Sequence, residues 1–310
     1  KVGINTGSPS IATATVTGSG TTLNTGKARI GNDGTGTLNI LNNASFDSDD
    51  IVDVGKGSGD GTLLVDDATF TVTAGNADLN IASGTSSSTG TVTFRNNASV
   101  TINDDFFLGR NGDGTLTVES GANVTTDDLL SAFETGSTAT TTITGSGTTL
   151  NANRQLLVGR FGDGTLTVQS GADVTAGNLK VATNSGSTST ATITGSGTTL
   201  TANGGTVKGK IGRSAGDSTA VVNVEDSAVL TLDIQTDVFS GGVLDLGSTG
   251  SGTVNGTGTI TLHGAGGTRI KGNGSISNAI DLEGGALGND SAGETLTLSG
   301  DIKDFDNGGE

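Results

Sequence analysis

The stretch from Leu108 to Val124 reads LGRNGDGTLTVESGANV, and the stretch from Val158 to Val174 repeats it almost unchanged as VGRFGDGTLTVQSGADV. Related text returns along the chain about every 25 residues. The apolar residues that close its strand-like segments are Val16, Ile40, Val65, Phe94, Val118, Ile143, Val168, Ile193 and Val224. A fixed period of roughly 20 to 50 residues is typical of a solenoid, in which each repeat buries its apolar face against its neighbours.

One repeat, residues 115–140, shows how a turn is built. Residues 115–118 and 122–126 alternate apolar and polar side chains and are rich in β-branched residues, which indicates strands. We expect Asp127-Asp128 to interrupt the second strand and Leu129-Leu130 to begin a third. The sequence therefore predicts an all-β fold, a right-handed parallel β-helix with about 25 residues per turn and roughly 12 turns.

The repeat also predicts the domain organisation. Residues 1–235 form the regular solenoid, and residues 236–310 continue it with shorter, irregular, Gly-rich turns. Longer gaps predict surface insertions near residues 83–90 and 201–218. Glycine recurs at one corner of the repeat, which predicts a backbone position with positive φ in each turn. These glycines are Gly31, Gly55, Gly109 and Gly159.

Composition excludes several classes of protein. The 310 residues carry a formal net charge of −17, so nucleic acid and anionic membranes are unsuitable partners. There is no apolar run of the roughly 18 residues that a membrane-spanning helix needs. There is no Cys, which excludes a disulfide scaffold and a thiolate metal site. Because the chain starts at Lys1 and contains no Met, we expect it to be a piece of a longer, processed precursor.

The two quoted segments resemble the repeat of type V secretion (autotransporter) passengers and of PEP-CTERM-sorted bacterial surface proteins. The resemblance covers roughly residues 10–235. Residues 241–246 and 256–260 resemble the Gly-rich repeats nearer the translocator of such passengers. The resemblance implies a β-solenoid, an extracellular or cell-surface location and a role as an adhesin, fibre or matrix component. It brings no catalytic residues, and it does not extend to the translocator barrel of a full autotransporter.

Paired carboxylates are the main candidate for a binding site. Asp49-Asp50, Asp104-Asp105 and Asp127-Asp128 follow their strands at similar distances, so we expect all three pairs at one corner of the solenoid. Carboxylate oxygens suit Ca²⁺, which would offset the repulsion between like charges on adjacent turns. The alternative is a solvated acidic edge that deters lateral aggregation.

Other chemistry-bearing residues have plainer interpretations. Asp33, Asp60, Asp113 and Asp163 each lie just before Gly or a Gly-Thr pair, which fits a turn dipeptide at least as well as a calcium loop. His263 has no catalytic partner near it in the sequence. Arg110, Arg154, Arg160 and Lys56 are expected to form ion-pair ladders with Asp on neighbouring turns. Because the carboxylates recur with the repeat, we expect no enzyme and no required cofactor, with calcium as the one candidate ion.

The leading functional hypothesis is a secreted structural protein, a rigid solenoid that builds an extracellular fibre, matrix filament or adhesin stalk and associates head to tail with itself. Its ends, residues 1–10 and 300–310, are expected to be uncapped. A second hypothesis is a monomeric autotransporter-type adhesin that binds a surface or carbohydrate ligand through its inserted loops. The third is a carbohydrate-active β-helix enzyme, which would need one non-repeating acidic cluster in a groove.

Overall fold

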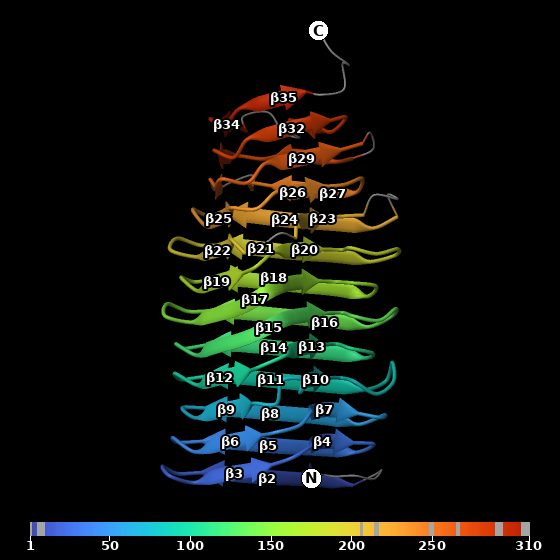
Figure 1. Cartoon of the computed structure of the whole chain (residues 1–310), viewed down its shortest axis with the longest axis vertical. Helices are drawn as coiled ribbons and strands as arrows, with labels where there is room; N and C mark the ends of the chain where they lie inside the picture. Colours follow the sequence, from blue (N-terminus) through green and yellow to red (C-terminus); the bar gives the residue numbers. More distant parts are fainter. Residues whose placement is uncertain are drawn as a thin grey trace. The chain divides into compact units, whose positions relative to one another are not determined.

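The chain folds as an all-β parallel solenoid with about 25 residues per turn and about 11 turns. The computed structural model describes residues 2–4, 10–204, 207–213, 217–247, 251–264, 267–288 and 294–304. Every regular element in these ranges is a strand (Figure 1). The predicted fold class and period are confirmed, and the number of turns is about 11 rather than 12. The right-handed sense of the coil stays a prediction.

The chain divides into two compact units, Lys1–Asn153 and Arg154–Glu310. Each turn of the first unit contributes three strands. The long first strands are β2 (Ile11–Thr17), β5 (Thr35–Leu41), β8 (Asp60–Asp66), β11 (Thr89–Arg95), β14 (Asp113–Glu119) and β16 (Thr138–Thr144). The second strands are β3 (Thr22–Thr25), β6 (Ser45–Ser48), β9 (Thr69–Val72), β12 (Ser99–Ile102) and the start of β15 (Asn123–Ser131). The third strands are β1 (Val2–Ile4), β4 (Ala28–Asn32), β7 (Val52–Lys56), β10 (Leu79–Ile81), β13 (Asp105–Leu108) and the end of β15.

The second unit follows the same plan, and β17 (Thr149–Val158) crosses from one unit into the other. Its first strands are β18 (Asp163–Gln169), β21 (Thr188–Thr194), β24 (Thr219–Glu225), β27 (Gly242–Asp245), β30 (Arg269–Lys271) and β33 (Ala286–Leu287). Its second strands are β19 (Asp173–Ala176), β22 (Thr199–Ala202), β25 (Val229–Leu232), β28 (Thr253–Asn255), β31 (Gly274–Ile276) and β34 (Leu296–Leu298). Its third strands are β20 (Leu179–Val181), β23 (Gly209–Ile211), β26 (Thr236–Val238), β29 (Ile260–His263), β32 (Ile280–Glu283) and β35 (Ile302–Asp304).

Each strand pairs in parallel with the corresponding strand one turn away, so side chains of one type stack in columns. In the first unit Leu38 pairs with Leu63, and Ile40 pairs with Val65. These side chains are completely buried, as the alternating pattern predicts. The core also contains a column of neighbouring rings: Phe46 stacks on Phe70, and Phe94 and Phe106 follow with tilted rings.

The corners behave as the glycines predict. Gly31, Gly55, Gly109 and Gly159 have φ values of 69°, 73°, 63° and 73°. Ala82, Ala132 and Ala182 occupy the same corner in other turns with φ near 50°. The positive φ is therefore required by the corner, and glycine is the residue that adopts it without strain.

Two local expectations meet the structure differently. Asp127-Asp128 does not interrupt a strand, because β15 runs continuously from Asn123 to Ser131. Strand β15 stays extended because its first half pairs with β12 and its second half pairs with β13. The insertion near residues 83–90 is fastened to the preceding turn, where the Thr85 hydroxyl donates to the Gly57 carbonyl. The insertion near residues 201–218 and the two expected uncapped ends lie partly outside the described residues.

Candidate functional site

The three aspartate pairs lie at the corner between the second and third strands of their turns. Asp49 and Asp50 follow β6 and are exposed. Asp104 lies between β12 and β13, Asp105 is the first residue of β13, and both are half-buried. The pair 127–128 lies within β15 and is also half-buried. The positions therefore agree with the expected corner, but exposure differs from pair to pair.

Two of the three pairs are brought together. Asp105 is the register partner of Asp128, and the Asp127 amide donates to the Asp104 carbonyl over 3.1 Å. The pair 49–50 is separated from them by the turn that contains β9 and β10. Asp49 instead lines a shallow, open groove with Asn24, Thr25, Gly26 and Asp47.

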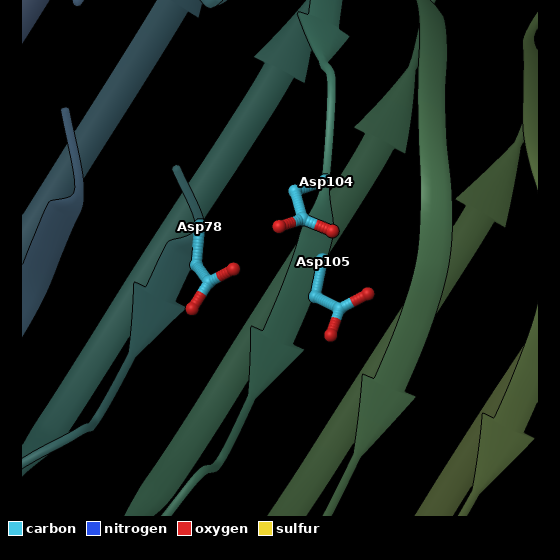
Figure 2. Close-up of side chains that lie close together, drawn as sticks. All are labelled: Asp78, Asp104 and Asp105. Atoms are coloured by element: carbon cyan, nitrogen blue, oxygen red, sulfur yellow. The ribbon is translucent and has the colours of Figure 1, made fainter. Parts of the chain in front are cut away.

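The intervening turn contributes Asp78, which completes a cluster that the sequence analysis missed. Carboxylate oxygens of Asp78, Asp104 and Asp105 lie within 4.8 Å of one another, and Figure 2 shows the three side chains gathered from adjacent turns. Asp78 directly precedes Leu79, just as Asp105 precedes Phe106, and these two apolar residues are register partners. The equivalent positions of Asp78 and Asp105 in their repeats could have revealed the cluster from the sequence. A search for adjacent pairs of aspartates does not find Asp78, because Asp78 has no aspartate beside it.

The electrostatics of this cluster raise the pKa of one carboxylate, that of Asp78. Burial raises the pKa of Asp78 to about 6, and the charges of Asp105 and Asp104 add to the increase. The Arg110 guanidinium and a hydrogen bond from the Asp105 backbone amide oppose it. Arg110 lies 3.8 Å from the Asp78 carboxylate, donates to Asn80 over 2.7 Å and covers the Phe107 ring. One cation thus serves several partners and compensates the acidic cluster only in part.

The chemistry of this cluster permits the two roles that the sequence left open. Three carboxylates at this separation are ligands that suit a hard divalent cation such as Ca²⁺. Without a cation, two unit charges at 4.8 Å repel by about 1 kcal/mol even in water, so the cluster is a repulsive acidic edge. The same residues serve either role, and a cation titration distinguishes them.

The aspartates of the Asp-Gly corners are engaged in bonds between turns. Each carboxylate accepts a hydrogen bond from the following turn over 2.7 to 3.1 Å. The pairs are Ser58 amide to Asp33, Thr89 hydroxyl to Asp60, Thr138 hydroxyl to Asp113 and Thr188 amide to Asp163. This arrangement supports the turn interpretation, because each side chain holds a corner to its neighbour.

The basic residues form part of the predicted ladder. Lys56 lies 3.1 Å from the buried carboxylate of Asp53 in its own strand, and Arg29 on the preceding turn lies 3.7 Å from it. Arg110 reaches Asp78 one turn back. Arg160 lies over the Phe161 ring, and the Arg154 carbonyl accepts a hydrogen bond from Asn178. Ion pairs between turns therefore occur at Asp53 and at Asp78.

His263 has partners that the sequence did not reveal. Its Nδ1 lies 2.6 Å from the Glu283 carboxylate and its Nε2 lies 3.3 Å from the Asp237 carboxylate, on the following and preceding turns. The imidazole stacks on Phe239 with ring centres 4.8 Å apart. Lys208 also reaches Asp237 over 3.3 Å. The residue thus links three turns of the second unit.

Comparison of the chain with family models, with curated proteins and with solved structures gave no significant match. None of the described residues belongs to a helix long and apolar enough to cross a membrane.

Proposed function

We propose that this chain is a secreted structural protein, a rigid β-solenoid that builds an extracellular fibre, matrix filament or adhesin stalk on a bacterial surface. One observation carries the proposal: every first strand of a unit pairs in parallel with the next, turn after turn. In the first unit seven-residue strands follow one another with the same register from β2 to β16. Continuous backbone ladders over a buried core resist bending, which is what a stalk or fibre needs.

The surface supports a structural role in water. Among the described residues only Ile11, Val207 and Ile302 are large apolar side chains with strong exposure. The net charge of −17 favours solubility and disfavours nonspecific lateral contact. The location follows the resemblance of residues 108–124 to autotransporter and PEP-CTERM repeats, and it belongs to the proposal.

The proposed partner is a second copy of the chain, joined head to tail. Within the first unit the first strands of successive turns have the same length and register, so the hydrogen-bonding edge of one of these turns is complementary to the edge of another. Contacts between unlike surfaces of identical subunits generate open filaments when the rotation does not close. No catalytic step is assigned, and the Asp-Gly carboxylates are already engaged in bonds between turns.

Negative-stain electron microscopy of the purified chain, with Ca²⁺ and with EDTA, tests the proposal. We expect filaments of uniform width that lengthen with protein concentration. Ile11→Lys places a charge on strand β2 at a side chain that is 79% exposed, and edge lysines oppose strand addition. Val207→Lys is the matched control, because Val207 is 52% exposed and lies outside the strands.

The expected result is shorter filaments for Ile11→Lys and unchanged filaments for Val207→Lys. Isolated short rods under all conditions would contradict self-assembly. They would favour the alternative, a monomeric autotransporter-type adhesin whose surface or carbohydrate ligand would be sought by binding assays.

A further inference from the structure

The outer face of the long-strand sheet in the first unit presents a column of threonines. One threonine per turn occupies the same position, and each is the register partner of the next. The six are Thr13, Thr37, Thr62, Thr91, Thr115 and Thr140, from β2, β5, β8, β11, β14 and β16. We call this column and the one beside it the threonine face.

The second column lies two residues further along each strand. It consists of Thr15, Asn39, Leu64, Thr93, Thr117 and Thr142. Parallel strands lie about 4.8 Å apart, and alternate residues of one strand are about 6.6 Å apart. The face is therefore a two-column grid with fixed spacings in both directions. It consists of threonine hydroxyl and methyl groups except at Asn39 and Leu64, and every residue of the second column except Thr15 is half-buried.

The hydroxyls of the first column are available to an outside partner. Within the described chain, none of the six donates to or accepts from another protein group, and all except the half-buried Thr37 are exposed. The column on the other side differs, because Thr89 and Thr138 donate to Asp60 and Asp113. Hydroxyls of that mixed column therefore bond to carboxylates of neighbouring turns, whereas the hydroxyls of the first column make no such bonds within the described residues.

The two columns of the threonine face contain no charged residue, although the column beside them contains the exposed Asp60 and Asp113 and the chain has a net charge of −17. A neutral face suits a neutral occupant. A second copy of the chain fits poorly, because two columns over six turns cover about 350 Å² from strand spacings, less than half of the roughly 800 Å² per partner of a stable interface. Neither column contains an aromatic ring for a sugar to stack upon.

We propose that the threonine face binds crystalline water, that is, the surface of ice. The oxygen lattice of hexagonal ice repeats over distances similar to the spacings of this grid. Each hydroxyl would bond one lattice water and each methyl would fill the space between waters. Because the parallel ladder holds the side chains in place before binding, little ordering entropy is lost.

Ice recrystallisation inhibition and thermal hysteresis of the purified chain test this assignment. We expect the wild-type chain to inhibit recrystallisation. Thr91→Lys, or Thr91→Lys with Thr115→Lys, places charge in the middle of the grid. We expect these variants to need about tenfold more protein for equal inhibition, equivalent to about 1.4 kcal/mol of lost binding. Asn123→Lys is the matched control, because Asn123 is an exposed strand residue of the other sheet.

Thermal melts establish that each variant is folded, and Thr91→Ser, which keeps the hydroxyl, should inhibit more strongly than Thr91→Lys. A wild-type chain that does not inhibit recrystallisation overturns the proposal, as does equal activity of wild type and the double variant. Analytical sedimentation tests whether a second copy of the chain occupies the face instead. Self-association of the wild-type chain that Thr91→Lys abolishes would assign the face to that second copy. Filament formation is scored separately, so failure of one proposal does not decide the other.

Discussion

Gly61 lies so close to Gly55 that a Cβ on Gly61 would overlap the backbone nitrogen of Gly55. It would also come within 2.6 Å of the Ile30 carbonyl oxygen on the preceding turn. The same approach recurs between Gly114 and Gly109. At these two turns the first strand therefore packs against the corner that follows the third strand, with no room for a side chain.

Gly61→Ala should lower the free energy of unfolding by about 3 kcal/mol or more, the upper end of the cost of overpacking. The clash involves backbone atoms, which cannot rotate away as a side chain can. Chemical denaturation of the purified variant measures the effect. Gly75→Ala is the control, since Gly75 is exposed and no atom lies within 4 Å of the place that an added methyl would take; its change should stay within about 0.5 kcal/mol. Equal effects at both positions would contradict the close approach.

The Phe70 ring holds the middle of the aromatic column in the core of the first unit. It is fully buried, stacks on Phe46 at 4.9 Å and lies 6.3 Å from Phe94. Phe70→Ala should lower the free energy of unfolding by about 3 to 5 kcal/mol, because it leaves a cavity that neighbouring turns fill only in part. The half-buried Phe161, which contacts Arg160, is the comparison. We expect a clearly smaller loss for Phe161→Ala, and similar losses would argue against a continuous ring column.

Periodicity was sufficient to predict most of the fold. The strands, their parallel pairing and the positive φ at Gly31, Gly55 and Gly109 all follow from one repeated unit. It could not predict that Asp127-Asp128 stays within a strand, because that depends on pairing with β12 and β13 on the adjacent turn. Local sequence shows where polar residues cluster, whereas hydrogen bonds between turns decide whether the backbone remains extended.

The raised pKa of Asp78 predicts a pH dependence of stability. The ordinary value is 3.8 and the folded value is about 6, so the folded state binds more protons than the unfolded state between these limits. Stability contributed by this group is therefore present at low pH and is lost as pH rises from about 4 through about 6. The shift of about two units corresponds to about 2 to 3 kcal/mol.

Unfolding of wild type and Asp78→Asn between about pH 4 and pH 7 checks this linkage. The variant should gain stability relative to wild type as pH rises through this window. Asp105→Asn removes a charge that raises the pKa of Asp78. This variant should therefore narrow the pH range over which stability falls. Parallel pH profiles for wild type and Asp78→Asn would show that the carboxylate does not titrate there.

Calcium should stabilise the chain if the cluster of Asp78, Asp104 and Asp105 serves as a cation site. Weak extracellular sites bind with dissociation constants of about 0.1 to 1 mM, so about 5 mM Ca²⁺ should add about 1 to 2 kcal/mol. Thermal melts above pH 6, where Asp78 loses its proton, measure the gain. Asp104→Asn should abolish the gain and Asp49→Asn should leave it intact, because Asp49 lies two turns from Asp104 and is not part of the cluster. No gain in wild type would assign the cluster to an acidic edge.

The sequence revealed less of this site than of the fold. The prediction found the stacked pairs 104–105 and 127–128 but missed Asp78, because one aspartate is no signal until its turn is placed in register. It missed the partners of His263 for a related reason. Turns after residue 235 vary in length, so a constant period does not align His263 with Asp237 and Glu283.

The His263 side chain should stabilise the second unit in two separable ways. Its ring stacks on Phe239, and its nitrogens lie beside the carboxylates of Glu283 and Asp237. His263→Ala removes both contributions and should lower the free energy of unfolding by about 1 to 3 kcal/mol. His263→Phe keeps an aromatic stack and should recover about 1 kcal/mol of that loss. Chemical denaturation of the three chains at one pH measures both contributions. If His263→Phe were no more stable than His263→Ala, stacking would contribute nothing, and the contacts of the two ring nitrogens with Glu283 and Asp237 would account for the whole effect.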